Sequence, residues 1–239
     1  MDVTNLNIRY DDGQTPLHVA SQLGQFEIMR SLIARGANPD SENAIEETPL
    51  FMASRNGNRD ITQLLLQNRA DVNHPDLEKR TPLHEASEKG HDSVVQLLLT
   101  SQANCNAKTT YQWTPLHLAS RTGKIAVVRV LLGQGAEVNV QNDSKWTPLH
   151  MASQKGHVQV VKLLLAKNAQ VDEKKADGET ALHLAAYYGH VEVVRLLISG
   201  GADQRIRNNK FKGETALDLA KNKGHENVVQ LFGAGIGRD

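Results

Sequence analysis

Apolar residues along the chain fall into two short groups that recur together at a constant interval. One group follows a threonine, as Leu17 does, and the other forms a run such as residues 158–166. The threonines are spaced 33, 33, 33, 33, 33 and 35 residues apart, at Thr15, Thr48, Thr81, Thr114, Thr147, Thr180 and Thr215. Self-similarity at a fixed period predicts a stack of repeats rather than one or two ordinary globular domains.

Each repeat is predicted to hold two helices. The threonine is placed to cap the first helix, because its side-chain oxygen can accept a hydrogen bond from a backbone N–H of the first turn. The proline that follows it in five repeats suits the first helical position, where its missing N–H is not needed. This helix is expected to end at a mid-repeat glycine such as Gly156. The second helix, for example residues 158–166, is apolar on more than one face, so neighbouring repeats must cover it on both sides.

A further left-handed position is expected where the second helix ends. Glycine stands there in some repeats, as Gly36, Gly135 and Gly201, whereas other repeats have Arg69, Gln102 and Asn168. We expect mild backbone strain at Arg69 and Gln102, because these side chains disfavour a left-handed conformation.

The motif Thr-Pro-Leu-His at residues 15–18, 81–84, 114–117 and 147–150, with its 33-residue period, resembles the ankyrin repeat. The resemblance covers nearly the whole chain. It implies an all-α fold, an ankyrin-repeat solenoid of stacked helix-turn-helix units joined by β-hairpin loops. We expect a single ankyrin-repeat domain over residues 1–232 and a flexible tail at residues 233–239. Its repeats are expected at about residues 7–39, 40–72, 73–105, 106–138, 139–171, 172–206 and 207–232.

The composition excludes several classes of partner. Lys plus Arg and Asp plus Glu both number 27, so the formal charge is zero, which argues against a general nucleic-acid or anionic-membrane binder. No long apolar run is present, so we expect no direct membrane insertion. One cysteine, Cys105, cannot form an internal disulfide, and residues 1–14 lack a secretory signal pattern. We therefore predict a cytoplasmic, reducing location.

Ten histidines raise the question of a metal site, but nine recur in register. Five hold the fourth motif position and four follow the mid-repeat glycine: His18, His84, His117, His150 and His183, then His91, His157, His190 and His225. The resemblance implies a structural hydrogen-bonding role for the motif histidine. We predict no metal, no cofactor and no catalytic residue, and we expect Cys105 to be a small buried apolar residue.

Positions that differ between repeats are where recognition is expected, and by resemblance the partner surface is the concave face. Trp113 and Trp146 each stand directly before a threonine, about 8–10 Å apart if the helices pack normally. Tyr187 and Tyr188 stand directly before a mid-repeat glycine. We predict that the following residues bind a protein or peptide: Arg80, Tyr111, Trp113, Arg121, Trp146, Lys155, Tyr187 and Tyr188.

Two alternatives stay open at these positions. The tryptophans could instead pack flat over neighbouring hairpins, since Gln112 and Lys145 replace a turn glycine present in other repeats. The charged residues on the same face carry both signs, which suits ordinary solvation or an extended peptide of mixed charge.

Asn73 and Asn139 close a pattern of Leu, five residues, an acid, Val and Asn. The pattern resembles the acceptor sequence of an asparaginyl hydroxylase that acts on ankyrin repeats, which would make the chain its substrate. These asparagines also have a plain structural role in stabilising the hairpin turn.

The leading hypothesis is a monomeric, non-enzymatic scaffold for protein binding. Two others remain: a section of a longer adaptor that tethers membrane proteins to the cytoskeleton, and a regulatory domain of a larger signalling enzyme. The first repeat, whose Leu23, Phe26 and Ile28 resemble those of an internal repeat, favours further repeats upstream.

Overall fold

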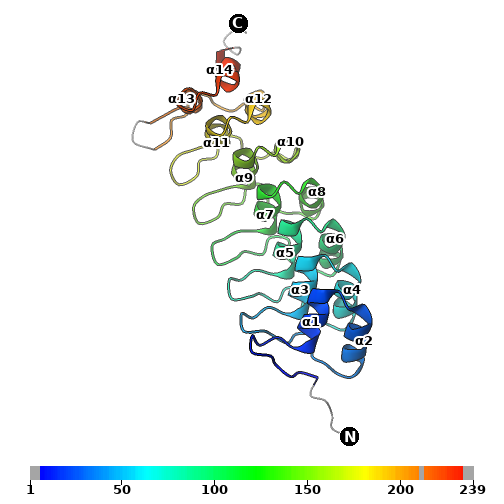
Figure 1. Ribbon diagram of the computed structural model, residues 1–239. Coiled ribbons are helices and arrows are strands. Elements are labelled where there is room, and N and C mark those ends of the chain that lie inside the picture. The colour runs from blue at the N-terminus through cyan, green and yellow to red at the C-terminus, as the bar shows by residue number, and fades with distance from the viewer. Residues whose placement is uncertain (1–5, 210–212, 234–239) are drawn as a thin grey trace.

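The computed structural model describes residues 6–209 and 213–233 of the chain. Within these residues the chain forms seven successive pairs of helices and no strand, as expected for an all-α solenoid. The pairs stack into an elongated array with the two termini at opposite ends (Figure 1). The helices are α1 (Pro16–Leu23), α2 (Phe26–Ala34), α3 (Pro49–Asn56), α4 (Arg59–Gln67), α5 (Pro82–Lys89), α6 (Asp92–Thr100), α7 (Pro115–Arg121), α8 (Ile125–Gly133), α9 (Pro148–Lys155), α10 (Val158–Ala166), α11 (Ala181–Tyr187), α12 (Val191–Ser199), α13 (Ala216–Asn222) and α14 (Glu226–Gly233).

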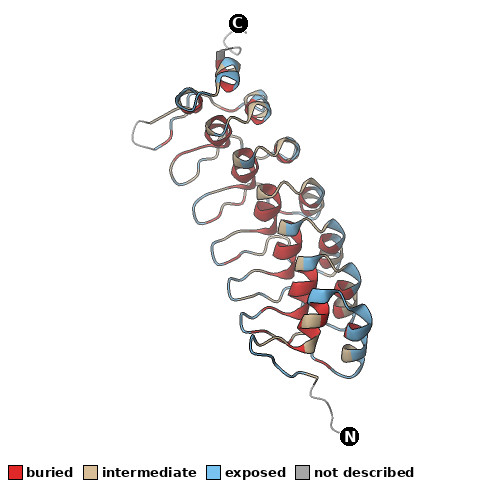
Figure 2. Ribbon diagram, in the orientation of Figure 1, coloured by how far each residue is buried: buried red, intermediate tan, exposed pale blue. Residues whose placement is uncertain are grey.

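The core runs along the stack between neighbouring repeats. The first helix of each pair packs against the first helix of the next, as α5 does against α3 and α7. Its motif leucine is fully buried, as at Leu83 and Leu116, and the following small residue, such as Ala119, lets the helices approach closely. Figure 2 shows the row of first helices as the most buried part of the array. No repeat encloses its own apolar side chains, so stability depends on the contacts between neighbours.

Threonine caps every first helix, as predicted. In the fourth repeat, the backbone N–H of Thr114 donates to Nδ1 of His117 at 3.1 Å, so Nδ1 accepts and Nε2 carries the proton. That Nε2 donates to the carbonyl of Trp146, in the next repeat, at 2.9 Å. The structural role predicted for the motif histidines is confirmed by the same bonds in three other repeats: His18 to Glu47, His84 to Trp113 and His183 to Glu214. His150 keeps the Nδ1 bond, but its buried Nε2 has no hydrogen-bond partner in the described part of the chain.

Burial keeps these histidines neutral. Desolvation lowers the pKa of His84, His117 and His150 from 6.5 to about 4, against the opposing effect of nearby backbone carbonyls. Burial also lowers the pKa of His18 and His183. Protonation would remove the acceptor at Nδ1 and place a positive charge in a low-dielectric interior. The fold therefore requires the neutral ring.

We predict that acid destabilises the array between pH 6.5 and pH 4. Above pH 6.5 these histidines are neutral in both the folded and the unfolded chain. Between pH 6.5 and pH 4 they are protonated in the unfolded chain but stay neutral in the folded chain. The free energy of unfolding therefore falls as the pH is lowered. Each of the three most shifted histidines contributes up to about 3 kcal/mol to this loss. Urea unfolding at pH 7.5, 6 and 5, followed by circular dichroism, measures the slope.

The His117→Phe variant, which copies Phe51 of the second repeat, tests the cause. It should be less stable than the parent at pH 7.5, because it loses two hydrogen bonds, yet lose less stability on acidification. An unchanged pH slope in this variant would assign the acid sensitivity to other groups.

The loop before each first helix projects to one side of the array as a finger, for example residues 104–114 (Figure 1). Each of the first six fingers is a hairpin closed by two backbone bonds, such as Thr109 N–H to the Trp113 carbonyl at 3.0 Å and Gln112 N–H to the Thr109 carbonyl at 2.9 Å. Neighbouring fingers share one more, such as Thr110 N–H to the Glu78 carbonyl at 2.8 Å. The predicted hairpins are therefore present, but no finger contains a β-strand within the described residues.

Left-handed backbone occurs at the positions predicted from the glycines. After the second helix, Arg69 has φ 67°, Gln102 has φ 69° and Asn168 has φ 62°. Gln112 and Lys145 adopt the same conformation at the fingertips, with φ of 60° and 59°. This conformation costs a residue other than glycine about 1–2 kcal/mol, so each of these positions lowers the stability of the fold.

We predict that Arg69→Gly raises the free energy of unfolding by roughly 0.5–1 kcal/mol, the relieved strain less the added entropy of the unfolded chain. Arg69 is exposed and forms no ion pair among the described residues, so nothing else is lost. The reverse change, Gly36→Arg, should cost a similar amount, since a Cβ there meets no atom within 4 Å. Urea midpoints of the two variants measure both effects, and changes of the same sign would contradict the explanation.

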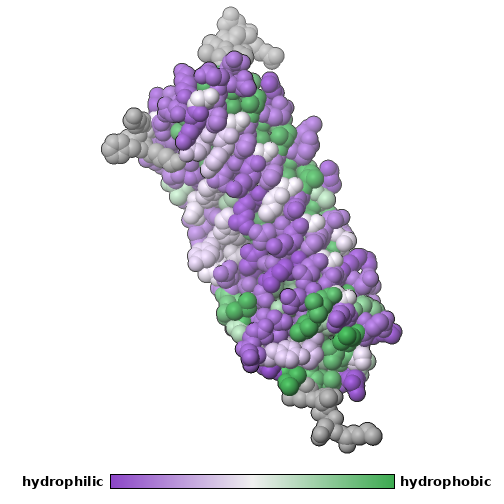
Figure 3. Space-filling view, in the orientation of Figure 1, coloured by the Kyte–Doolittle hydropathy of each residue, from purple (hydrophilic) through white to green (hydrophobic). Residues whose placement is uncertain are grey.

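Apolar side chains are exposed at the first repeat, where Leu23 is 62% and Ile28 is 51% accessible. Figure 3 shows hydrophobic side chains gathered at this end of the array, while the rest of that face is mainly hydrophilic. No helix in the described part of the chain is long and apolar enough to cross a membrane. The tail predicted at residues 233–239 lies outside the described residues except for Gly233, which ends α14.

Candidate partner-binding face

The variable positions of the repeats form one continuous face, which we call the finger face. It combines the residue before each threonine, at the base of the finger, with the residue eight positions later, near the end of the first helix. The two contact one another within a repeat: Glu47 pairs with Arg55, Arg80 with Glu88, and Asn222 donates to Glu214 at 2.7 Å. The two positions are therefore in contact in repeats two, three, four and seven, where Trp113 and Arg121 make the pair of the fourth repeat.

Histidines of neighbouring repeats fix the backbone under these pairs. The motif histidine holds the finger-base carbonyl of the next repeat, as His84 does for Trp113 at 3.1 Å. The histidine after the mid-repeat glycine holds the helix-end carbonyl of the preceding repeat, as His157 does for Arg121 at 3.0 Å. Side chains at both positions can therefore differ between repeats without disturbing the stack.

In repeats two to four the pairs join into a continuous ion-pair chain. It runs Glu47, Arg55, Glu85, Arg80, Glu88 and Arg121. Arg55 Nε lies 3.0 Å from Glu85, and Arg80 donates to Glu85 and Glu88 at 2.6 Å each. Glu85 is only 5% exposed, so its buried negative charge must be compensated by the two arginines, Arg55 and Arg80. These charges form a paired network rather than an independently solvated surface.

The network alters the titration of its members. Burial alone would raise the pKa of Glu88, but hydrogen bonds and charge from Arg80 and Arg121 outweigh it and hold that pKa below its usual range. The acidic partners also outweigh desolvation at Arg55 and Arg80, whose pKa values are raised. Glu88, Arg55 and Arg80 are therefore charged at neutral pH.

We predict that Glu85→Gln lowers the free energy of unfolding by about 1–2 kcal/mol, since two partly buried arginines lose a shared carboxylate. The loss should shrink in 0.5 M salt, which screens the parent network. Glu27→Gln, which breaks the exposed pair with Arg30, is the matched control and should cost under about 0.5 kcal/mol. Equal effects of the two changes would show that the chain adds no more than a surface ion pair.

Aromatic residues replace acids and bases in repeats four to six. Trp113 lies edge-on to His117 at 5.9 Å between ring centroids, with the Arg121 guanidinium 4.9 Å from its indole. Trp146 is edge-on to His150 at 6.1 Å, with Lys175 Nζ 5.0 Å from its ring. Both indoles are half-buried, so they pack against their own finger and still reach the surface.

Two adjoining hollows open between these rings. The Trp113–Trp146 hollow, of about 430 Å³, is also lined by Tyr111, Arg121, Lys155 and the buried side chain of Met151. The Trp146–Tyr187 hollow, of about 220 Å³, is also lined by Lys175, Glu179, Leu184 and Tyr188. Trp146 is the wall shared by both, so the rings form one strip across three repeats. Tyr111 and Tyr188 are the most open, at 64% and 47% exposed.

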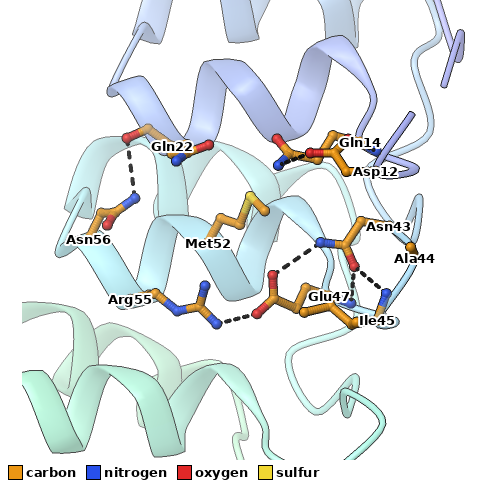
Figure 4. Close-up of a pocket in the computed structure, with 10 residues that line it drawn as sticks. All are labelled: Asp12, Gln14, Gln22, Asn43, Ala44, Ile45, Glu47, Met52, Arg55 and Asn56. Atoms are coloured by element: carbon orange, nitrogen blue, oxygen red, sulfur yellow. Dashed lines mark hydrogen bonds and ion pairs between the residues drawn. The ribbon is translucent and has the colours of Figure 1, made fainter. Parts of the chain in front are cut away.

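A third hollow lies on the finger face at repeats one and two, and its polar groups are already bonded to one another (Figure 4). Asn43 Nδ2 donates to Glu47 at 3.1 Å, Arg55 pairs with Glu47, and Asn56 Nδ2 donates to the Gln22 carbonyl at 3.2 Å. The hollow measures about 320 Å³ and no aromatic residue lines it. It therefore offers no ring surface, and its Glu47 and Arg55 are already paired with each other.

Comparison with known proteins agrees with this architecture. The family model for ankyrin repeats, in three copies, matches residues 2–76, 23–109, 72–142, 123–208 and 171–236. This chain belongs to the ankyrin-repeat family. The crystal structure of the human ASB11 ankyrin repeat domain is similar to it, with a TM-score of 0.83 and 31% identity, over 91% of this chain and 97% of that one. A comparison with curated proteins gave no significant match.

Ankyrin repeats generally mediate protein–protein interaction, and the fold is typically a non-enzymatic module. Among the described residues no group of three or more His, Cys, Asp or Glu side chains could hold a metal ion.

Seven of the eight predicted binding residues line the two aromatic hollows of this ankyrin array. Arg80 lines neither, because Glu85 and Glu88 hold it within the ion-pair chain. Three further residues were not predicted from the sequence: Met151 and Leu184, which line the hollows, and Glu85 of the ion-pair chain. All three occupy the position after the motif histidine, so aligning that column would have found them.

The two predicted hydroxylation sites have their side chains engaged between ankyrin repeats. Asn73 Oδ1 accepts from the Asn104 backbone N–H, and Asn139 Oδ1 accepts from that of Gln170, both at 2.8 Å. Each asparagine thus bridges to the next repeat instead of bracing its own turn alone. Hydroxylation of Asn73 and Asn139 stays a prediction.

Cys105 is half-buried, not fully buried as expected, because its loop lies at the surface of the array. Its thiol lies 3.5 Å from the Gln134 carbonyl. Desolvation raises the pKa of the Cys105 thiol, so the unreactive protonated form predominates at neutral pH.

Proposed function

We propose that this ankyrin-repeat chain is a non-enzymatic scaffold that binds a protein or peptide on its finger face, the concave side of the array. The observation that carries the proposal is the aromatic strip: five of the six Trp and Tyr residues of the chain line two adjoining hollows. Tryptophan and tyrosine dominate the energetic centres of interfaces, because they bury large area with few rotatable bonds.

The rest of the finger face supports repeats four to six as the centre of binding. Charges in repeats two to four already neutralise one another, so a partner gains little by displacing them. The indoles are held upright by their histidine and cation neighbours, which reduces the entropy lost on binding.

We place this activity in the reducing cytoplasm, in keeping with the single protonated Cys105, and we expect a monomer. No catalysis is proposed, because the histidines, the residues best suited to acid–base chemistry, serve the fold.

We predict that the double variant Trp113→Ala, Trp146→Ala loses capture of its partners while the array stays folded. Each tryptophan anchor is expected to contribute about 2 kcal/mol, so binding should weaken more than tenfold. The measurement is quantitative mass spectrometry of proteins retained by immobilised parent and variant. Tyr10→Ala, which removes an exposed aromatic residue from the first finger, is the control and should retain the parent's set.

Circular dichroism of the double variant separates the two roles of the indoles. A thermal midpoint close to the parent's, with lost capture, supports the binding role. Melting of the middle repeats, or unchanged capture, supports the packing alternative instead.

A second candidate, a section of a longer adaptor, is favoured by the exposed Ile28 of the first repeat. A further repeat stacked there would bury this side chain, as the equivalent Ile61 and Val94 are buried in the following repeats.

A further inference from the structure

The aromatic strip has a period that matches one type of peptide backbone. Its rings recur once per repeat, and stacked helices lie about 8–10 Å apart. A polyproline II helix rises 3.1 Å per residue with three residues per turn, or about 9 Å per turn. Such a segment would therefore bring the same face, one side chain in three, to each successive hollow.

The strip also offers the hydrogen-bond donors that this backbone lacks. The indole N–H groups of Trp113 and Trp146 have no partner in the described protein and are not sealed from solvent. The Tyr188 hydroxyl accepts a bond from Gln154 at 3.4 Å, which leaves its own proton to donate. Polyproline II carbonyls have no internal partner, and aromatic grooves with such donors are a recurring way to bind them.

An added β-strand fits the face less well. No finger has a strand in the described residues, and backbone groups at the fingertips already bond to neighbouring fingers, as Ala176 N–H does to the Ser144 carbonyl at 3.0 Å. Strand addition needs a row of free backbone donors and acceptors, which the fingers do not present.

The charges around the hollows determine which charge a ligand residue should carry there. Arg121 is paired with Glu88, and Lys175 is paired with Asp177 and Glu179, so neither is available. Lys155 lines the larger hollow from the helix end, is exposed, and forms no ion pair among the described residues. Asp143, from the fingertip, also lines that hollow and would repel an acid, so an acidic ligand residue belongs beside Lys155.

We propose that the strip binds a proline-rich polyproline II segment with a large apolar residue at every third position and an acidic residue facing Lys155. This inference rests on the proposed function and specifies its ligand. The two hollows and the surface next to them each receive one apolar side chain, while the indole N–H groups donate to the segment's carbonyls.

Three fluorescein-labelled peptides of nearly identical composition test the proposal by fluorescence anisotropy. The first, PLPELPPLP, places leucines three residues apart and carries one glutamate. The second, PLPLELPPP, has the same residues with leucines two apart, and the third, PLPKLPPLP, replaces glutamate by lysine. The full chain should bind the first at least tenfold more tightly than either of the others.

Variants of the chain link that preference to named residues. Trp146→Ala should abolish binding of the first peptide, and Trp146→Phe, which keeps a ring but removes the N–H donor, should weaken it several-fold. Lys155→Glu should reverse the preference between glutamate and lysine. Lys162→Glu makes the same charge change on the exposed side of α10 and should leave the preference unchanged.

The proposal is overturned if no peptide binds, if leucine spacing has no effect, or if an amphipathic helical peptide with the same leucines binds best. Should that happen while the double tryptophan variant still loses protein capture, the scaffold function stands and only the ligand class is wrong. Loss of both results would remove the function and the ligand together.

Discussion

Two columns of histidines, one buried and one half-buried, couple neighbouring repeats, and the rest of the structure depends on them. One column reaches forward to the finger-base carbonyl of the next repeat, and the other reaches back to the helix-end carbonyl of the preceding one. Because the bonds end on backbone atoms, they constrain position without constraining residue type. Tryptophan, arginine or glutamate can therefore occupy the same position in different repeats. The finger face has a fixed backbone and variable side chains.

Where a histidine is missing, another polar group makes a similar connection. In the second repeat Asn56 Nδ2 donates to the equivalent helix-end carbonyl, that of Gln22, at 3.2 Å. In the fourth, Lys124 stands after the mid-repeat glycine, and Thr122 Oγ1 donates to the Glu88 carbonyl at 3.0 Å. Retaining the bond while changing its donor indicates that the constraint lies on the carbonyl, since an unpaired buried carbonyl would cost more than a changed side chain.

The sequence predicts the parts of this fold that follow from local chemistry repeated seven times. A threonine such as Thr114 caps the first helix in every repeat, and a glycine such as Gly156 ends it in a left-handed conformation. The left-handed backbone of Arg69 is predicted from Gly36, which stands at the same position one repeat earlier. Pairing between different repeats is harder to predict. That Arg55 of the second repeat pairs with Glu85 of the third depends on side-chain rotamers across a repeat boundary, which periodicity does not encode. The partial exposure of Cys105 likewise depends on how far its loop lies from the core.

Arg121 is where the two halves of the finger face meet. Its guanidinium ends the ion-pair chain at Glu88 and lies 4.9 Å from the indole of Trp113, the first ring of the aromatic strip. A free arginine over an indole would attract an anionic ligand, but pairing with Glu88 removes most of that field. Lys155, one repeat further on, has no such partner among the described residues. The finger face thus changes from charged to aromatic side chains at the point where the paired cation Arg121 gives way to the unpaired cation Lys155. A ligand at the hollows therefore meets the positive charge of Lys155.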